Sequence, residues 1–302
     1  MQALSGLIRT MRPRQWTKNV LFVFPALFFD AQLFSPAFFN VLAACVFMIL
    51  MSGTVYIIND LVDIEKDRQH PRKKFRPLAA GEVPLPLAQA AAVLIPIVAL
   101  ILAASWNWKL AVVMMIYLVS QIAYSFYLKN VVIIDVLTVA SGFVLRVIAG
   151  VVVIEVARFS PWLYAAAGLL ALFLVVSKRR QELINLGANA VNTRPIFQQY
   201  NLPLLDDMLR MVTTSTLITY ILYTIERETA IQVTGVNLTL ATVPFVLYGL
   251  FHYLYLVHVK EESAPPDEVL LKDFRLQVVL VLWGISYLII IYGLPVILSQ
   301  TR

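Results

Sequence analysis

The stretch PAFFNVLAACVFMILMSGTVYIINDLVDIEKD, residues 36–67, joins a long apolar segment directly to a cluster of acidic residues. Its apolar part, 36–58, is long enough to cross a hydrocarbon core about 30 Å thick as one helix. The polar part begins at Asn59 and places Asp63 and Asp67 at successive intervals of four residues. On a helix such residues share one face, with a drift of about 40° per step. The pattern predicts a membrane-spanning helix with a column of oxygen ligands at its polar end.

The same alternation of apolar blocks and short polar loops runs through the whole chain of 302 residues. The chain is 60% hydrophobic and 14% charged, with a mean hydropathy of +0.79. Soluble domains are about half apolar and about a quarter charged. We therefore predict an all-α polytopic membrane protein, one integral-membrane domain over residues 1–302. The spans, about nine in number, are expected at 19–34, 36–58, 84–104, 107–128, 133–154, 160–178, 204–226, 238–258 and 276–298.

Lysine and arginine are distributed unevenly between the two predicted faces of the membrane. If the basic N-terminus lies in the cytoplasm, the loops 59–83, 178–203 and 259–275 lie on that side too. This is the positive-inside pattern of multi-pass proteins. We expect a plasma-membrane protein whose active-site loops, near 59–83 and 178–203, face the cytoplasm. The same distribution explains the net charge of +6, so no nucleic-acid partner is expected.

Basic residues follow the acidic column at once. Carboxylate and amide oxygens suit Mg²⁺, which proteins usually bind through one or two carboxylates together with substrate phosphates. The candidate metal ligands and catalytic residues are Asn59, Asp63 and Asp67. Acidic residues that can bind a metal ion, next to basic residues that can bind phosphate, predict a binding site for a diphosphate. The alternative is a solvated helix end whose acids are neutralised by the neighbouring bases. Asp60 and Glu65 point away from the shared face, and we expect them either to support the metal ligands or to face solvent.

Three stretches resemble the UbiA superfamily of intramembrane prenyltransferases. Asn59-Asp60-x-x-Asp63-x-x-x-Asp67 resembles the first aspartate-rich motif of that superfamily. Residues 12–19, RPRQWTKN, and 70–81, HPRKKFRPLAAG, look most like its decaprenyl-phosphate phosphoribosyltransferase branch. The resemblance implies a nine-helix fold and phosphoribosyl diphosphate as donor. The predicted activity is thus Mg²⁺-dependent transfer of 5-phosphoribose to a polyprenyl phosphate, with release of pyrophosphate.

The chain departs from the superfamily after the sixth span. Prenyl-diphosphate enzymes of the superfamily carry a second motif there, Asp-x-x-x-Asp, whereas this chain has SKRRQE at 177–182. Three bases in place of two acids predict an anion site suited to a lipid monophosphate. The alternative is that Lys178–Arg180 merely end the span under the positive-inside rule. Asp206 and Asp207 follow Pro203, so we interpret them as helix N-terminal caps rather than the missing acids.

Other candidate residues lie outside these motifs. A buried guanidinium such as that of Arg146, near the middle of a span, is costly unless it is paired or faces a polar cavity. It is either a phosphate clamp or a structural partner of an acid. Asp135 is either a helix-start acid or a partner for ribose hydroxyls. The predicted substrate-binding residues are Arg14, Lys18, Arg68, His70, Lys73, Lys74, Arg76, Tyr124, Lys129, Asp135, Arg146, Lys178, Arg179 and Glu182.

Two other functions stay open. Prenyl transfer from a polyprenyl diphosphate to an aromatic or other lipid acceptor would use the same first motif but normally needs the second acidic pair. A transporter would be expected to carry polar residues in the middle of several spans. Here charge gathers in end loops instead. The sequence leaves open the lipid chain length and whether the protein is a homo-oligomer.

Overall fold

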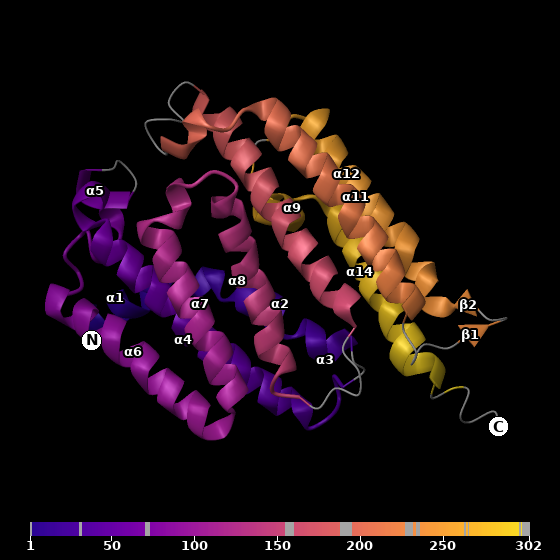
Figure 1. Cartoon of the computed structure of the whole chain (residues 1–302), viewed down its shortest axis with the longest axis horizontal. Helices are drawn as coiled ribbons and strands as arrows, with labels where there is room; N and C mark the ends of the chain where they lie inside the picture. Colours follow the sequence, from indigo (N-terminus) through magenta and orange to yellow (C-terminus); the bar gives the residue numbers. More distant parts are fainter. Residues whose placement is uncertain are drawn as a thin grey trace. The chain divides into compact units, whose positions relative to one another are not determined.

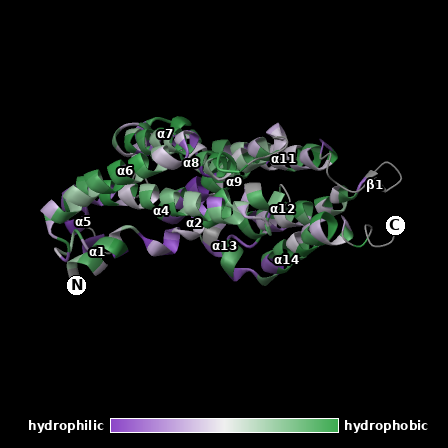
Figure 2. Cartoon of the chain, turned by 90° about the horizontal axis from the view of Figure 1, so that it is seen from below, coloured by the Kyte–Doolittle hydropathy of each residue, from purple (hydrophilic) through white to green (hydrophobic). Residues whose placement is uncertain are grey.

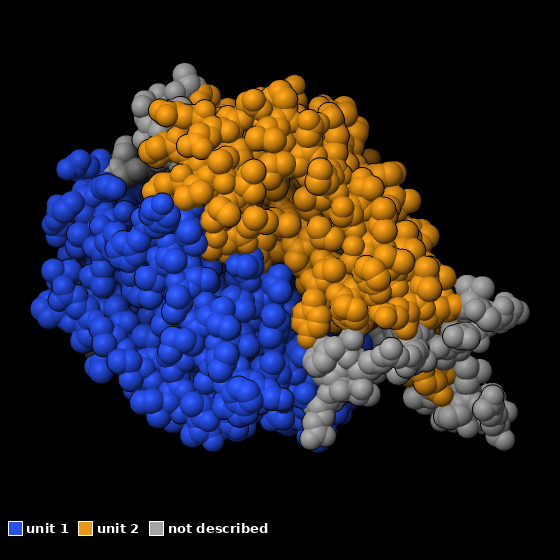
Figure 3. All heavy atoms as spheres, viewed as in Figure 1, with its two compact units in different colours: residues 1–129, 141–157 blue, residues 130–140, 158–302 orange. Residues whose placement is uncertain are grey.

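The protein is built almost entirely of helices (Figure 1). The computed structural model describes residues 2–29, 32–69, 73–154, 160–187, 195–226, 232–233, 236–262, 264, 266–295 and 297. His70, one of the predicted site residues, lies outside these ranges. The chain divides into two compact units, each described by itself below: unit 1, residues 1–129 and 141–157, and unit 2, residues 130–140 and 158–302 (Figure 3). The single domain expected over 1–302 stays a prediction.

Unit 1 contains the N-terminal helices and the acidic motif. Proline, which lacks an N–H, begins a new helix at Pro25 and so divides the first apolar segment. Asn107 caps the helix that follows it by accepting the N–H of Leu110. The elements are α1 (Gln2–Thr10), η1 (Pro13–Gln15), α2 (Thr17–Val23), α3 (Pro25–Phe29), α4 (Ala37–Val62), α5 (Ile64–Gln69), η2 (Lys73–Phe75), α6 (Leu85–Trp106), α7 (Trp108–Phe126), η3 (Leu128–Asn130) and the later part of α8 (Ile134–Val151).

The core of unit 1 lies where α2, α4, α7 and α8 meet. Its fully buried members include Val23, Met48 and Leu110. A Cβ atom at Gly150 would collide with the backbone carbonyl of Val23, so only glycine permits this approach of α8 to α2. This close packing holds α2 and α8 in fixed register beside α4.

Unit 2 is a second group of helices with a core of its own, formed by side chains such as Phe173, Leu205 and Tyr253. Two short strands pair antiparallel, with Gln232 opposite Asn237. The elements that follow α8 are α9 (Pro161–Leu186), η5 (Pro195–Gln198), α11 (Leu202–Glu226), β1 (Gln232–Val233), β2 (Val236–Asn237), η6 (Leu238–Thr242), α12 (Val243–His258), α13 (Pro266–Lys272), α14 (Phe274–Leu288) and the π-helix η7 (Ile289–Gly293).

Within the described residues, seven helices are long and apolar enough to cross a membrane. In Figure 2 the ribbon is coloured by hydropathy, and hydrophobic residues predominate along helices such as α4 and α6. The all-α, multi-pass prediction is confirmed. All nine predicted spans fall on helical segments, but the count of nine is not confirmed. The segment Thr17–Phe29 is short. Although α11 has 25 residues, it carries Asp206, Asp207 and Arg210 and is not among the seven.

Candidate active site

The acidic motif lies where α4 ends and α5 begins. Asp63 stands between the two helices with φ −96° and ψ 10°. The helical hydrogen bonds nevertheless continue across it: the N–H of Asp63 donates to the carbonyl of Asn59 (3.0 Å), and the N–H of Asp67 donates to that of Asp63 (2.8 Å). The predicted one-turn spacing of the three residues is therefore present in the backbone.

Two buried carboxylates of this motif share basic partners. Nη1 of Arg76 donates to Oδ2 of Asp67 at 2.6 Å and to Oδ1 of Asp60 at 3.1 Å. Nη2 of Arg12 donates to the same Oδ1 of Asp60 at 2.8 Å, and Nζ of Lys73 lies 3.9 Å from Oδ1 of Asp67. The side chains of Asp60 and Asp67 are only 2% and 3% exposed. We call these five residues the charge cluster.

The charge cluster corrects part of the sequence interpretation. Of the two alternatives for Asp60, the structure rules out the solvent-facing one, because Asp60 is a buried centre of two ion pairs. Arg76, predicted to hold substrate phosphate, here neutralises two carboxylates. Arg12 was absent from the predicted site. It lies in the family-like stretch 12–19, but nothing in its spacing shows that it reaches a residue 48 positions away.

The remaining oxygen ligands are open to a cation. The side chains of Asn59 and Asp63 are half-buried and have no hydrogen bond or ion pair with the described residues. Oδ2 of Asp60 is buried and has no hydrogen-bond partner in that part of the chain. Within the described residues no three His, Cys, Asp or Glu side chains lie close enough together to hold a metal ion by themselves. An oxygen set of one amide and two carboxylates, completed by substrate phosphate, fits the way Mg²⁺ is usually bound.

The other predicted bases of the 59–83 loop surround this motif on the surface. Arg68 is exposed and pairs with Glu65 at 2.7 Å. Lys74 is exposed, and its Nζ lies 5.2 Å from the ring centroid of Phe75. The other predicted binding residues of unit 1, leaving Arg146 aside, are exposed or half-buried: Arg14, Lys18, Tyr124 and Lys129.

Arg146 is a buried cation without a carboxylate partner in the described chain, and its side chain belongs to unit 1. Nε donates to Oδ1 of Asn19 (2.7 Å), Nη1 to the carbonyl of Gly142 (2.8 Å) and Nη2 to the hydroxyl of Tyr117 (2.7 Å). Its guanidinium carbon lies 4.9 Å from the ring centroid of Tyr117. All three acceptors are neutral. The structure therefore does not support a pair with an acid, and no carboxylate among the described residues compensates the positive charge of Arg146.

Unit 2 holds a separate buried polar cluster around Asp135. Oδ2 of Asp135 accepts Nε–H of Arg179 at 2.8 Å, and Oδ1 accepts the hydroxyl of Tyr200 at 2.6 Å. Arg179 also pairs with Glu182 at 2.7 Å. Burial, reinforced by the hydrogen bond to Asp135, raises the pKa of the Tyr200 phenol. Asp135 does lie in the first turn of α8, but both its oxygens are engaged inside unit 2 rather than free for a ribose.

The three bases at 178–180 do not form one open anion site. Arg179 and Arg180 are buried, and Nε of Arg180 donates to Oδ1 of Asp206 at 2.5 Å. Only Lys178 is exposed. The interpretation of Asp206 and Asp207 as helix caps is wrong. The helix α11 begins at Leu202, and Oδ1 of Asn201 accepts the N–H of Leu204 (2.8 Å) as its cap.

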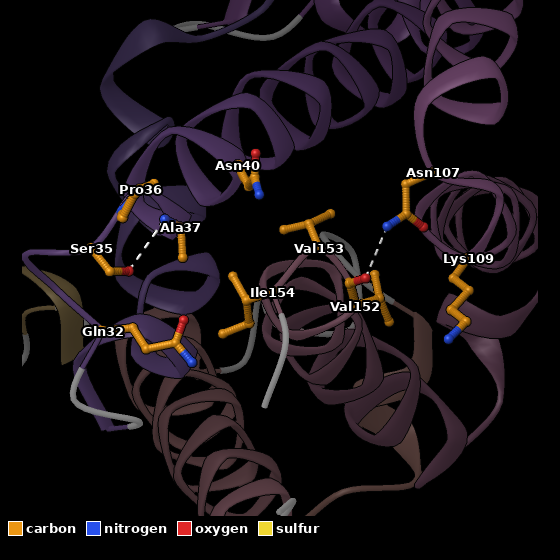
Figure 4. Close-up of a pocket in the computed structure, with 10 residues that line it drawn as sticks. All are labelled: Gln32, Ser35, Pro36, Ala37, Asn40, Asn107, Lys109, Val152, Val153 and Ile154. Atoms are coloured by element: carbon orange, nitrogen blue, oxygen red, sulfur yellow. Dashed lines mark hydrogen bonds between the residues drawn. The ribbon is translucent and has the colours of Figure 1, made fainter. Parts of the chain in front are cut away.

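A pocket of about 630 Å³ lies elsewhere in unit 1, at the end of α4 remote from Asp63 (Figure 4). α4 has 26 residues and therefore separates its two ends by about 39 Å. In Figure 4 Asn107 donates to the carbonyl of Val152, and Lys109 is the one charged side chain drawn. No predicted site residue lines this pocket, so it is not the candidate active site.

The amino-acid sequence of the chain matches a known protein family. Residues 19–279 match the UbiA prenyltransferase family. The chain belongs to this family. The decaprenyl-phosphate phosphoribosyltransferase of Mycolicibacterium smegmatis is 32% identical over 288 residues, which cover 93% of this chain and 90% of that protein. The protein of the same name from Corynebacterium glutamicum is 31% identical over 294 residues, covering 96% and 88%.

Solved structures share the fold. A UbiA homologue from Archaeoglobus fulgidus bound to DMAPP and Mg²⁺ superposes with a TM-score of 0.70 at 18% identity, covering 95% of this chain and 99% of that one. At this identity the likeness concerns the fold. The predicted family and the predicted class, a multi-pass membrane transferase, are confirmed.

Proposed function

We propose that this UbiA-family protein transfers 5-phosphoribose from phosphoribosyl diphosphate to a polyprenyl phosphate and releases pyrophosphate in a Mg²⁺-dependent reaction. The support is its similarity, over more than nine-tenths of its length, to relatives named for that activity. The uneven distribution of lysine and arginine supports a place in the plasma membrane with the acidic motif facing the cytoplasm.

In this proposal the acidic motif is the donor end of the site. Asn59, Asp63 and Asp67 would hold Mg²⁺, which when bound neutralises charge on the leaving diphosphate. Lys73 and Lys74 lie on the adjoining segment and supply positive charge for the phosphate groups, while Arg76 neutralises Asp60 and Asp67. Carboxylates nearby stabilise the positive charge that develops at C1 of the ribose, as they do in glycoside hydrolysis.

The acceptor needs a positive charge rather than a base. A phosphate monoester has a second pKa near 6 and is already an anion at neutral pH. One of its oxygens forms the new bond to C1 while the bond from C1 to the diphosphate oxygen breaks, so no proton has to be removed. Arg146 is suited to bind such a phosphate because it is buried and has no carboxylate partner in the described chain.

Unit 2 contributes two kinds of residue to the proposal. Lys178 is exposed and keeps its charge free for an anion, because it has no partner among the described residues. Arg179 and Glu182 belong to the cluster around Asp135, so their role is to keep that part of α9 and α8 in place.

The test is a choice of donor. Purified protein in nanodiscs with Mg²⁺ and a polyprenyl phosphate is given phosphoribosyl diphosphate or a polyprenyl diphosphate, and pyrophosphate release and the lipid product are followed by mass spectrometry. We expect 5-phosphoribose linked through C1 to the polyprenyl phosphate with the first donor alone. Pyrophosphate release only with the polyprenyl donor and an aromatic acceptor would replace this proposal by prenyl transfer.

A further inference from the structure

The guanidinium of Arg76 bridges two buried carboxylates, those of Asp60 and Asp67. Nη1 of Arg76 donates to Asp67 at 2.6 Å and to Asp60 at 3.1 Å. Asp67 belongs to the column of expected metal ligands, whereas Asp60 is one residue away from Asn59 and off the shared face. A cation that binds Asp67 must therefore compete with Arg76 for the same carboxylate.

Asp60 has an unused site for this guanidinium. Oδ1 of Asp60 already accepts from both Arg12 and Arg76, while Oδ2 is buried and has no partner in the described chain. A carboxylate can accept both prongs of an arginine at once, and such a bidentate pair is stronger than a single contact. If Arg76 leaves Asp67, its guanidinium can therefore donate a second hydrogen bond to Asp60, at Oδ2.

The other partner of Asp60 is held firmly. Arg12 has a left-handed backbone with φ 55°, a conformation that favours glycine and is costly for a residue with a Cβ atom. Its guanidinium also lies 4.5 Å from the ring centroid of Tyr56. Because Arg12 is fixed by the ring and the carboxylate together, Arg76 is the partner that can move.

We propose that Asp60 is a positioning residue that receives Arg76 when a divalent cation binds Asp67. In the cation-free protein Arg76 is the internal counter-ion of Asp67. In the loaded protein it forms a two-pronged pair with Asp60 and stays beside the cation. This inference rests on the metal site of the proposed function, and it adds a residue and an exchange of partners to that site.

The test measures cation affinity without any substrate. Full-length protein in nanodiscs is titrated with Mn²⁺, which prefers oxygen ligands as Mg²⁺ does, and free Mn²⁺ is measured by electron paramagnetic resonance. Arg76→Gln should bind Mn²⁺ about tenfold more tightly, because a competing ion pair worth about 1.4 kcal/mol is gone. Asp60→Asn should bind it several-fold more weakly, because Arg76 then stays on Asp67.

Charge-matched controls separate the exchange from general electrostatics. Lys66→Gln removes one positive charge next to Asp67 from an exposed side chain without a described partner, and should change the affinity by less than about twofold. Glu65→Gln removes one negative charge from an exposed side chain whose partner among the described residues is the exposed Arg68, and it too should change the affinity by less than about twofold. In the double variant Asp60→Asn/Arg76→Gln the loss caused by Asp60→Asn should largely disappear, because Asp60 acts through Arg76.

The outcomes are distinct. If the wild-type protein binds Mn²⁺ but Arg76→Gln binds it no more tightly than Lys66→Gln, the exchange is refuted while the proposed function stands. If the wild-type protein binds no Mn²⁺ even with phosphoribosyl diphosphate present, both fail. Should Asp60→Asn not fold, the comparison of Arg76→Gln with Lys66→Gln still decides.

Discussion

Asp63→Ala should remove activity and leave the fold intact. The side chain of Asp63 is half-buried and has no hydrogen bond or ion pair with the described residues, so truncation breaks no polar contact within that part of the chain. We expect the free energy of unfolding to change by less than about 0.5 kcal/mol. If the carboxylate is a metal ligand, its loss should lower kcat/KM by at least about 100-fold, equivalent to about 2.7 kcal/mol of transition-state stabilisation.

The neighbouring acid gives the contrast. Asp60 is 2% exposed and ion-paired with Arg12 and Arg76, which are 33% and 28% exposed. Removing one partner of a buried pair usually costs about 3–5 kcal/mol, and the partial exposure of both arginines reduces this to about 2 kcal/mol. Asp60→Ala should therefore lower the melting temperature clearly, whereas Asp63→Ala should not.

The assay pairs two measurements on the same preparations. Pyrophosphate release from phosphoribosyl diphosphate gives kcat/KM, and thermal unfolding in nanodiscs gives the melting temperature. Normal turnover by Asp63→Ala would refute the metal role of the motif. A melting temperature that falls as far in Asp63→Ala as in Asp60→Ala would refute the structural reasoning.

Three further predictions test other parts of the molecule. Tyr200→Phe should lower the free energy of unfolding by about 1–3 kcal/mol, because it removes the hydroxyl that donates to buried Asp135 and accepts the N–H of Ile133. The raised pKa of Tyr200 adds a pH signature: the advantage of wild type over Tyr200→Phe should be full below pH 10 and decline as the pH rises further, as seen by thermal unfolding. Arg146→Gln should raise KM for the polyprenyl phosphate by about tenfold or more, because a charge-assisted contact to phosphate is lost; an unchanged KM would count against the phosphate role. Asp207→Asn should change neither stability nor activity measurably, since its pair with Arg210 is exposed on both sides, and a drop in melting temperature above about 2 °C would contradict this.

Much of the fold and the spacing of the acidic motif could be predicted from residues close together in the sequence. The apolar blocks located the seven long apolar helices, and the four-residue spacing placed Asn59, Asp63 and Asp67 one turn apart. Both rest on local physics: a span is a run of apolar residues, and a turn of helix is a hydrogen bond between residues four apart. For the same reason the count of spans stayed uncertain at α11, where polar residues interrupt the run.

The partners of the charged residues were decided only by the tertiary structure. Arg12 meets Asp60 across 48 positions, Arg180 meets Asp206 across 26, and Arg179 meets Asp135 across 44. Periodicity states which face of a helix a side chain occupies, but not which helix lies opposite. Whether a base holds substrate or a neighbouring acid depends on that packing, and so the sequence showed which charges were present, while the fold determined which of them remained free.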